Sequence, residues 1–454
     1  MAAPVSEVVL RPGVVTELGG FTGHDVPDDD LLRACVHCGM CLPTCPTYRL
    51  TGQEASSPRG RLWMMRAVAD ERLELLDPVF DEQMYQCLNC RACEAVCPSG
   101  VHYGPLVEAS RAQLEQHRPR PLLQRVARRA GLEWPFADIR RLRTMVNGLR
   151  LYQRSGLATL IRRLGLIRLL RLADLEAMLP LIQEAPLVSG AERWQPREAT
   201  GAVSLFNGCV MSTVFAHVNR ATGRVLAHNG FAVDVPAGQQ CCGALHVHSG
   251  MSDEARRLAR KNIDAFDSSA NDPIVINAAG CGAALKEYGL LLKDDPEYAQ
   301  SARRFSERVR DVTELLAERP LRQPTRSVDR VVTYQEPCHL AHAQRISAQP
   351  RALLNQIEGL KVVEMHEASL CCGSAGIYNI IRREMANELG DRKIERALAT
   401  GADEIVTANP GCAMQLRTSL LRNGVTRPVR HVVEVLDEAY GGASSTSPVQ
   451  RVGS

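Results

Sequence analysis

The chain has 454 residues, enough for about three domains of ordinary size, and its 45% hydrophobic and 23% charged residues are typical of a folded, water-soluble protein. The net charge of +3 is too small to indicate a polyanionic partner for the whole chain. Sixteen cysteines are too few in this length for a small disulfide scaffold, and they indicate metal binding in a reducing compartment. Residues 1–15 lack the pattern of a secretion signal and no apolar run is long enough to span a bilayer, so we expect a cytoplasmic protein.

The segment from Cys35 to Cys97 holds two copies of the pattern C-x2-C-x2-C-x3-C-P. In two-cluster ferredoxins this run binds a 4Fe–4S cluster with its first three cysteines, while the fourth ligates the other cluster. Zinc is the alternative, but zinc typically takes cysteines as separated pairs. We therefore expect an α-helical ferredoxin-type domain at residues 1–110 with two 4Fe–4S clusters. Cluster 1 is expected on Cys35, Cys38, Cys41 and Cys97, and cluster 2 on Cys87, Cys90, Cys93 and Cys45.

The elements around these cysteines are predicted to be helices. Three aspartates precede a helix that begins near Leu31, where their charge complements the helix N-terminus. Apolar side chains recur along residues 59–76 with helical spacing and predict a second helix, with Pro58 near its start. Arg59 and Arg61 either belong to this helix start alone or offset the charge of a cluster or a partner.

Residues 111–198 are expected to form a basic helical connector. Between 111 and 171 the chain has fifteen Arg and no Lys against three acidic residues. Four glycines, Gly148 among them, and Pro135 predict short helices rather than one long helix. Packing on the other domains is the simplest interpretation, and peripheral contact with the anionic cytoplasmic face of the inner membrane is the alternative. A nucleic-acid partner is not expected, because stacking aromatic residues are few.

From residue 199 onward the chain repeats itself at a period near 130 residues, as 371 − 241 = 130 shows for the Cys-Cys-Gly triplets. The period predicts duplicated domains at 199–324 and 325–440, each closing on V-x-E-x-L, before a disordered tail at 441–454. Short β-rich runs alternate with helical stretches, which predicts a parallel, doubly wound sheet in each copy. The cysteines follow strands, at the edge where such sheets bind ligands. They are Cys209, Cys241, Cys242 and Cys281 in the first copy and Cys338, Cys371, Cys372 and Cys412 in the second.

Several motifs together resemble one known family. They are the paired cysteine runs, S-P-R-G-R at 57–61, C-C-G-A-L-H at 241–246, G-C-G-A-A-L-K-E-Y at 280–288, C-C-G-S-A-G at 371–376 and T-A-N-P-G-C at 407–412. Over nearly its full length the chain is similar to the iron–sulfur subunits of glycolate oxidases, a family with two ferredoxin-type motifs and two cysteine-rich CCG domains. The resemblance implies that a separate flavoprotein (FAD) subunit oxidises glycolate to glyoxylate and that this chain passes the electrons on to a quinone-type acceptor.

One departure from a related family concerns the CCG domains. The CCG-containing subunit of heterodisulfide reductases has a fifth cysteine three residues after the last one in each domain, where this chain has Ala284 and Gln415. Disulfide-exchange catalysis is therefore not expected. Four cysteines per copy suffice for one further iron–sulfur cluster in each CCG domain, and a domain that serves only to assemble the complex is the alternative.

Four histidines and two glutamates lie close to the domain cysteines in the sequence. A histidine near a metal site is more often a hydrogen-bond donor or a surface residue than an iron ligand. The glutamates are candidates to relay protons for a quinone. The histidines are His246, His248, His339 and His342, and the glutamates are Glu287 and Glu336.

The chain has neither a G-x-G-x-x-G motif after a strand nor a Walker lysine loop, so we expect no flavin or nicotinamide and no catalytic residue in it. Iron–sulfur clusters take electrons singly, and a two-electron donor such as the flavin of a partner must split the pair. The sequence therefore predicts the electron-transfer subunit of a glycolate dehydrogenase complex. The same role in a lactate or glycerol 3-phosphate dehydrogenase complex is the alternative.

Overall fold

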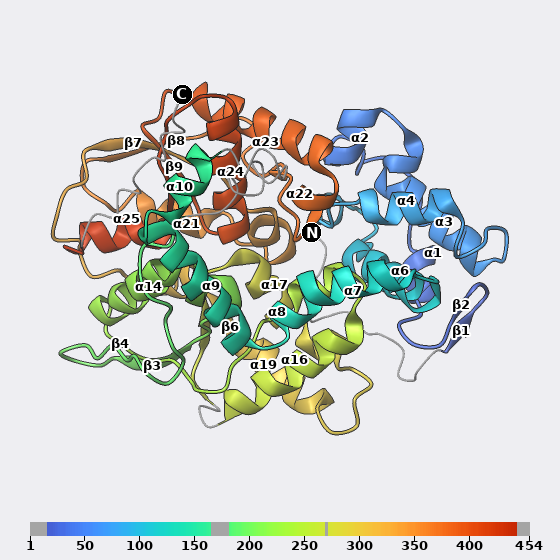
Figure 1. Cartoon of the computed structure of the whole chain (residues 1–454), viewed down its shortest axis with the longest axis horizontal. Coiled ribbons are helices and arrows are strands. Elements are labelled where there is room, and N and C mark those ends of the chain that lie inside the picture. Colours follow the sequence, from blue (N-terminus) through green and yellow to red (C-terminus); the bar gives the residue numbers. More distant parts are fainter. Residues whose placement is uncertain (1–15, 165–180, 268–270, 443–454) are drawn as a thin grey trace.

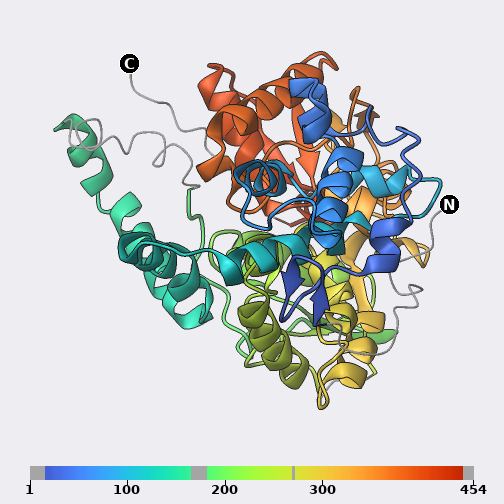
Figure 2. The same cartoon turned by 90° about the vertical axis from the view of Figure 1, so that its right-hand side faces the viewer.

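The computed structural model describes residues 16–164, 181–267 and 271–442, so most of the predicted tail lies outside the described residues. Figure 1 shows a helical N-terminal region in blue, one α/β domain from green to yellow, and a second α/β domain from orange to red. Figure 2 turns the N-terminal region toward the viewer and shows it seated against both α/β domains. The predicted order, a helical domain followed by two α/β domains, is confirmed.

The N-terminal region is a small helical domain with a core of its own. Phe21, Met65 and Phe80 are fully buried there, and the rings of Phe21 and Phe80 pack with their centroids 6.3 Å apart. Two short antiparallel strands close one side of the domain. The elements are β1 (Glu17–Leu18), β2 (Phe21–Thr22), α1 (Asp29–Arg33), α2 (Pro46–Thr51), η2 (Glu54–Ser56), α3 (Pro58–Ala69), α4 (Pro78–Gln86), α5 (Ala92–Ala95) and α6 (Tyr103–His117).

The predicted helix starts are confirmed, but one predicted helix end is wrong. Asp28 caps α1 by accepting a hydrogen bond from the Leu31 amide at 3.0 Å. The helix expected over 59–76 ends at α3's last residue, seven positions early. Glu71 there adopts a left-handed φ of 56°, and the next two amides both donate to the carbonyl of Ala67. This turn leads the chain away before the apolar periodicity ends.

The basic connector forms a row of helices that crosses the molecule and then leaves its surface. Figure 2 shows the connector along one side of the molecule, with α10 reaching furthest from it. Leu142 and Val146 of α9 are buried in the core of the α/β domains. The predicted breaks are confirmed only in part. Gly156 follows the end of α9, but Gly148 lies inside α9, and Gly131 and Pro135 lie in a continuous helical run over 122–136. Gly165 lies outside the described residues. Among the described helices none is long and apolar enough to cross a bilayer. The elements are α7 (Leu122–Arg128), η3 (Arg129–Glu133), α8 (Trp134–Phe136), α9 (Ile139–Arg154) and α10 (Leu157–Arg163).

The first α/β domain contains a four-stranded sheet in the order β4-β3-β5-β6, with all neighbours parallel. The central strand β5 is apolar and fully buried, as a parallel strand covered on both faces must be. The elements are β3 (Gly201–Leu205), α13 (Cys209–Thr213), α14 (Ala216–His228), β4 (Phe231–Asp234), α15 (Ala244–His248), α16 (Ser252–Ala265), β5 (Ile274–Ile276), α17 (Ala279–Lys286), α18 (Tyr288–Leu291), α19 (Ala299–Arg308), β6 (Val309–Asp311) and α20 (Val312–Ala317).

The second α/β domain repeats this topology with the order β8-β7-β9-β10, again all parallel. The predicted duplication into two parallel sheets is confirmed. The elements are β7 (Arg330–Tyr334), η5 (His339–Ala343), α21 (Ala348–Leu354), β8 (Leu360–Val363), α22 (Tyr378–Ile381), α23 (Arg383–Leu398), β9 (Glu404–Thr407), α24 (Pro410–Arg422), β10 (Val429–His431) and α25 (Val432–Ala439).

The repeated V-x-E-x-L closings are helix starts with capping boxes. In α20 the Glu314 carboxylate accepts a hydrogen bond from the Asp311 amide at 3.0 Å, and in α25 Glu434 accepts one from His431 at 2.7 Å. Each box satisfies an amide that the helix itself cannot pair. The glutamate of the repeat is therefore explained by helix capping.

The two α/β domains pack on each other beside their last cysteines. The Ala279 amide donates to the Ala408 carbonyl at 3.2 Å, and the Gly280 amide donates to Asn409 Oδ1 at 3.3 Å. These contacts join the starts of α17 and α24, the helices that carry the last cysteine of each copy. Both cysteine-bearing edges therefore face the centre of the molecule.

Candidate iron–sulfur sites

The thiols expected to hold cluster 1 meet at the surface of the N-terminal domain. Cys35, Cys38, Cys41 and Cys97 line one small pocket, and Cys93 reaches the same pocket. Cys38 is exposed, while the other three thiols expected on cluster 1 are half-buried. The last cysteine of the second run thus lies among the first three of the first run, the arrangement that crosswise ligation needs.

The thiols expected to hold cluster 2 lie deeper in the molecule. Burial raises the pKa of the Cys93 thiol, and the neighbouring Glu94, Cys90, Cys87 and Cys45 raise it further. The four thiols therefore lie close enough to interact. Which cysteine binds which cluster stays a prediction.

A buried arginine lies against this second set. Arg61 is 0% exposed, and it donates hydrogen bonds to the Gln83 carbonyl at 2.7 Å and to Thr47 Oγ1 at 3.1 Å. Burial opposes its charge, but the thiols of Cys87 and Cys45 raise the pKa of the guanidinium. A buried cation is unfavourable unless negative charge faces it, so Arg61 fits beside an anionic cluster.

In the first α/β domain four thiols converge beyond the carboxyl ends of β3, β4 and β5. The Sγ atoms of Cys209 and Cys241 lie 3.4 Å apart, and the Cys242 thiol interacts with both Cys241 and Cys281. Hydrogen bonding from Cys209 and Cys242 lowers the pKa of the Cys241 thiol. A lowered pKa favours the thiolate, the form that binds metals.

His246 in α15 adds an unsatisfied group to this domain's cysteine set. Its side chain is fully buried, neither ring nitrogen is hydrogen-bonded within the described residues, and it helps to lower the pKa of Cys241. Buried polar groups without a partner are rare in folded proteins. A bound cluster here would supply the missing partner, and the second copy has Gly376 at the corresponding position.

The second α/β domain gathers its thiols in the same way. The Sγ atoms of Cys338 and Cys371 lie 4.0 Å apart, and the Cys372 thiol interacts with Cys371 and Cys412. The amide of Asn409 donates to Cys412 Sγ at 3.4 Å. All sixteen cysteines of the chain are free thiols, so each is available as a ligand.

A buried lysine accompanies this second domain's cysteine set. Lys393 is only 2% exposed and donates to the Ala368 carbonyl at 3.1 Å. Burial lowers the pKa of its ammonium group, while the thiols of Cys372 and its three partners raise it. The first copy has Ile263 at the corresponding position. A buried ammonium group beside four thiols fits a bound group that carries negative charge.

The second set of the N-terminal domain adjoins the set of the second α/β domain. Cys90 and Cys371 belong to one buried apolar cluster, against which Cys338 packs, and the Cys338 thiol raises the pKa of Cys90. The His339 Nε2 atom donates to the Asn89 carbonyl at 2.9 Å and ties the two loops together. These two cysteine sets are therefore neighbours across the domain interface.

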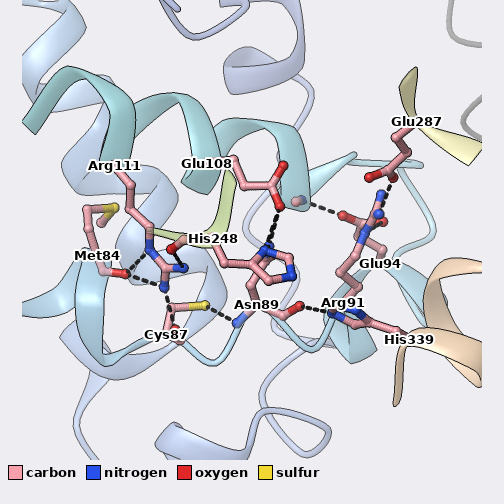
Figure 3. A network of polar contacts seen from close by, with 11 residues as sticks. Met84, Cys87, Asn89, Arg91, Glu94, Glu108, Arg111, His248, Glu287 and His339 are labelled. Carbon is pink, nitrogen blue, oxygen red and sulfur yellow. Dashed lines mark hydrogen bonds and ion pairs between the residues drawn. The ribbon is translucent and has the colours of Figure 1, made fainter. Parts of the chain in front are cut away.

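A polar network links the same N-terminal loop to the first α/β domain (Figure 3). Arg111 in α6 donates to the Met84 carbonyl at 3.0 and 2.8 Å, to the Cys87 carbonyl, and to the His248 carbonyl at 2.9 Å. No local spacing in the sequence relates α6 to a loop of the next domain, so Arg111, Asn89, Arg91 and Glu108 could not be predicted as parts of one network.

The remaining candidates are largely hydrogen-bonded. The His342 Nε2 atom donates to the Ser369 carbonyl at 3.0 Å, which agrees with the expected role as a donor. Glu336 pairs with Arg351 at 2.8 Å in the second domain. Within the described residues no three His, Cys, Asp or Glu side chains gather around a single metal-ion position.

Family models define the class of protein. A "4Fe-4S dicluster domain" matches residues 31–101, and a "Cysteine-rich domain" matches twice, at 203–286 and 332–417. The chain is thus an iron–sulfur protein, with a dicluster domain for 4Fe–4S clusters followed by two CCG domains. A third model, "Glycolate oxidase iron-sulfur subunit, linker region", matches residues 123–179 of the connector.

Similar proteins identify the family. A "Probable glycolate oxidase iron-sulfur subunit" of Bacillus subtilis is 42% identical over 92% of this chain and 96% of its own length. The "Glycolate oxidase iron-sulfur subunit" of Escherichia coli is 36% identical over 90% of this chain and 95% of its own. A "Lactate utilization protein A" of Shouchella clausii is 30% identical over 52% of this chain and 98% of its own. The chain belongs to the family of glycolate oxidase iron–sulfur subunits.

Proposed function

We propose that this chain is the electron-transfer subunit of a glycolate dehydrogenase complex. A flavoprotein partner oxidises glycolate to glyoxylate, and this chain carries the electrons to a quinone-type acceptor. The clusters supply one-electron transfer between these two-electron reactions. The residues of the chain hold the carriers in sequence and set the charge around them.

The contact of Cys90 with Cys338 and Cys371 is the observation that supports electron transfer most strongly. It brings the more buried cysteine set of the dicluster domain, expected to hold cluster 2, into contact with the cysteine set of the second CCG domain across the domain interface. Arg61 and Lys393 place buried positive charge beside these two sets. A domain that served only to assemble the complex would have no need of buried cations beside its thiols.

A second candidate function is the same electron-transfer role beside a partner that oxidises lactate. The Shouchella clausii relative, named for lactate utilisation, aligns with about half of this chain. Relatives named for glycolate oxidase align with nine-tenths of it or more. The difference in coverage favours a glycolate-oxidising partner.

Replacing Cys90 by Ser tests the proposed function in the complex purified with its flavoprotein partner. We expect the variant to lose glycolate-dependent dye reduction while the partner keeps its flavin, because the second cluster loses a ligand. The wild-type complex should oxidise glycolate faster than lactate or glycerol 3-phosphate in the same assay.

Ala95→Ser, in the same cysteine-rich segment, is the matched control and should leave dye reduction intact. Full activity of the Cys90→Ser complex would overturn the role as an electron carrier. A preference for lactate would keep that role and change the partner's substrate.

The projecting connector supports a further part of the proposal, attachment to an anionic membrane surface. Exposed apolar side chains and exposed arginines share the same two helices, α9 and α10, and their surroundings. Exposed apolar groups mixed with arginines suit the boundary between lipid head groups and acyl chains. The apolar side chains are Met145, Leu151, Leu157, Leu160 and Leu164, and the arginines are Arg140, Arg141, Arg154 and Arg163.

A further inference from the structure

A cavity of about 550 Å³ lies between the dicluster domain and the first CCG domain. Leu106 and Ala109 of α6 form one wall, and Ala284 of α17 and Leu291 of α18 lie on the wall of the CCG domain. Val247 of α15 lines it as well. A largely apolar cavity of this volume is the size that small organic ligands occupy in proteins.

Two predicted cluster sites border the cavity. Cys242 of the first CCG domain lines it directly. Arg91, which also lines it, directly follows Cys90 of the dicluster domain. A ligand in the cavity would therefore lie between carriers that deliver electrons one at a time.

Arg91 is a buried cation with one unused donor. It is 3% exposed, its Nε donates to Glu94 Oε2 at 3.1 Å, and its Nη1 pairs with Glu287. Its Nη2 has no hydrogen-bond partner among the described residues. Buried donors are rarely left unpaired, so Nη2 is available to an acceptor atom of a ligand.

His248 and Glu108 form a charge-relay pair on the cavity wall (Figure 3). His248 Nδ1 lies 3.1 Å from Glu108 Oε1, and Asn89 Nδ2 donates to the same oxygen at 2.7 Å. Burial opposes the charge of Glu108, but the hydrogen bond from His248 and the arginines nearby lower the pKa of this carboxyl. Because Nδ1 faces Glu108, Nε2 is the nitrogen that can reach a ligand.

The charge of the lining selects the chemistry of the ligand. Seven Asp or Glu side chains and four Arg or Lys side chains line the cavity. An excess of acidic groups disfavours carboxylate anions such as a hydroxy acid. A neutral ring with carbonyl oxygens meets the apolar walls and the unused donor of Arg91 together.

We propose that this cavity is the quinone site of the chain. Arg91 donates a hydrogen bond to one quinone oxygen, and His248 donates a proton to a quinone oxygen. This inference rests on the proposed function and deepens it. A quinone here takes two electrons, which originate from the hydroxy acid oxidised by the flavoprotein partner, and two protons, and it leaves as the quinol.

The proton enters through His248. When both ring nitrogens of His248 carry a proton, Nδ1–H donates to the Glu108 carboxylate and Nε2–H to the quinone oxygen, and transfer leaves the neutral imidazole. Water then reprotonates Nε2, so each quinol formed draws its two protons from solvent. Arg111, which holds the His248 carbonyl, is a positioning residue.

A photoreactive azidoquinone locates the site on the cluster-loaded full chain. After anaerobic illumination and digestion, we expect label on α6, α15 or α17. Decylubiquinone should protect these segments, and glycolate should not. Label confined to other segments would overturn the assignment.

A cavity-filling variant provides a binding readout. Ala284→Phe should weaken decylubiquinone binding at least about tenfold in titration calorimetry, because the new ring occupies the space of the ligand. Ala352→Phe, the same substitution at an exposed position of α21, should bind as the wild type does. Iron content confirms that both variants carry their clusters. Unchanged binding by Ala284→Phe would contradict the proposal.

His248→Gln separates proton delivery from binding in the complex. We expect kcat with decylubiquinone to fall by about tenfold or more, while KM for the quinone changes by less than about threefold. His366→Gln, at an exposed position, should change neither value. An unchanged kcat for His248→Gln would remove His248 from the reaction.

The outcomes distinguish this inference from the proposed function. Quinone reduction that continues unchanged in the Ala284→Phe complex would place the site elsewhere and leave the proposed function standing. A wild-type complex that reduces dyes but neither binds nor reduces any quinone would refute the proposed acceptor itself.

Discussion

Arg61 carries the clearest test at the scale of one residue. Its guanidinium is fully buried and faces the Cys87 and Cys45 thiols. A reduced 4Fe–4S cluster carries one more negative charge than an oxidised one, so nearby buried positive charge favours reduction. We therefore expect Arg61 to raise the reduction potential of the cluster beside it.

Arg61→Met should lower the reduction potential of one of the two dicluster centres and leave the other nearly unchanged. The measurement is an anaerobic redox titration followed by electron paramagnetic resonance. Arg61→Lys keeps the charge and should recover most of the shift.

Arg72→Met removes a half-exposed arginine of the same domain and serves as the control, with no expected shift. Equal potentials in the Arg61→Met and wild-type chains, at equal iron content, would show that Arg61 has only a structural role.

At the scale of elements, Glu367 joins α2 of the dicluster domain to α23 of the second CCG domain. Its carboxylate pairs with Arg49 of α2 and with Arg392 of α23, the latter at 2.6 Å. The Arg392 hydrogen bond lowers the pKa of Glu367 to about 2, against the effect of burial and with help from Arg49. A lowered pKa means that this contact stabilises the fold above the ordinary carboxyl pKa and is lost only as pH falls toward about 2.

Glu367→Gln should lower the free energy of local opening of α2 by about 1–3 kcal/mol, because Arg49, Arg392 and Arg396 lose their shared anionic partner. Hydrogen exchange of the backbone amides at residues 46–51 measures this opening free energy. The loss should be the same at pH 6 and pH 8, since Glu367 stays ionised across that range. Protection equal to the wild type at both values would show that the ion pair does not hold the domains together.

The elements also show what sequence can and cannot predict. The strands β3, β5, β7 and β9 follow from short apolar, β-branched runs, and the duplication follows from the cysteine period. The strands β6 and β10 have three residues each, and Arg310 and Arg430 at their centres hide any apolar pattern. Their presence depends on the sheet edge that they complete, which no local signal encodes.

The residues that line the cavity could not be predicted from the sequence either. The convergence of cysteines was predictable, since parallel sheets bring the ends of their strands to one edge. Arg91, Glu108, His248 and Glu287 come from separate segments of two domains. Only the docking of those domains brings the four residues together.

At the scale of the whole molecule, the end of the connector projects beside the two α/β domains (Figure 2) and carries exposed apolar and arginine side chains. The full chain should sediment with vesicles containing an anionic phospholipid and bind neutral vesicles much less. Replacing Leu151, Leu157 and Leu160 by Asn should cut the bound fraction severalfold, because the apolar contact is lost.

Ile381→Asn removes an exposed apolar residue of α22 and is the matched control, with binding unchanged. Raised salt should weaken the attachment, because arginines contribute to it. Equal binding to neutral and anionic vesicles would contradict the membrane-facing assignment of α9 and α10.

Rapid freezing of the complex after it meets glycolate tests electron transfer through this chain most directly. We predict that the cluster signals in electron paramagnetic resonance change within one turnover and return when quinone is added. Clusters that stay oxidised while glyoxylate accumulates at the full rate would contradict it.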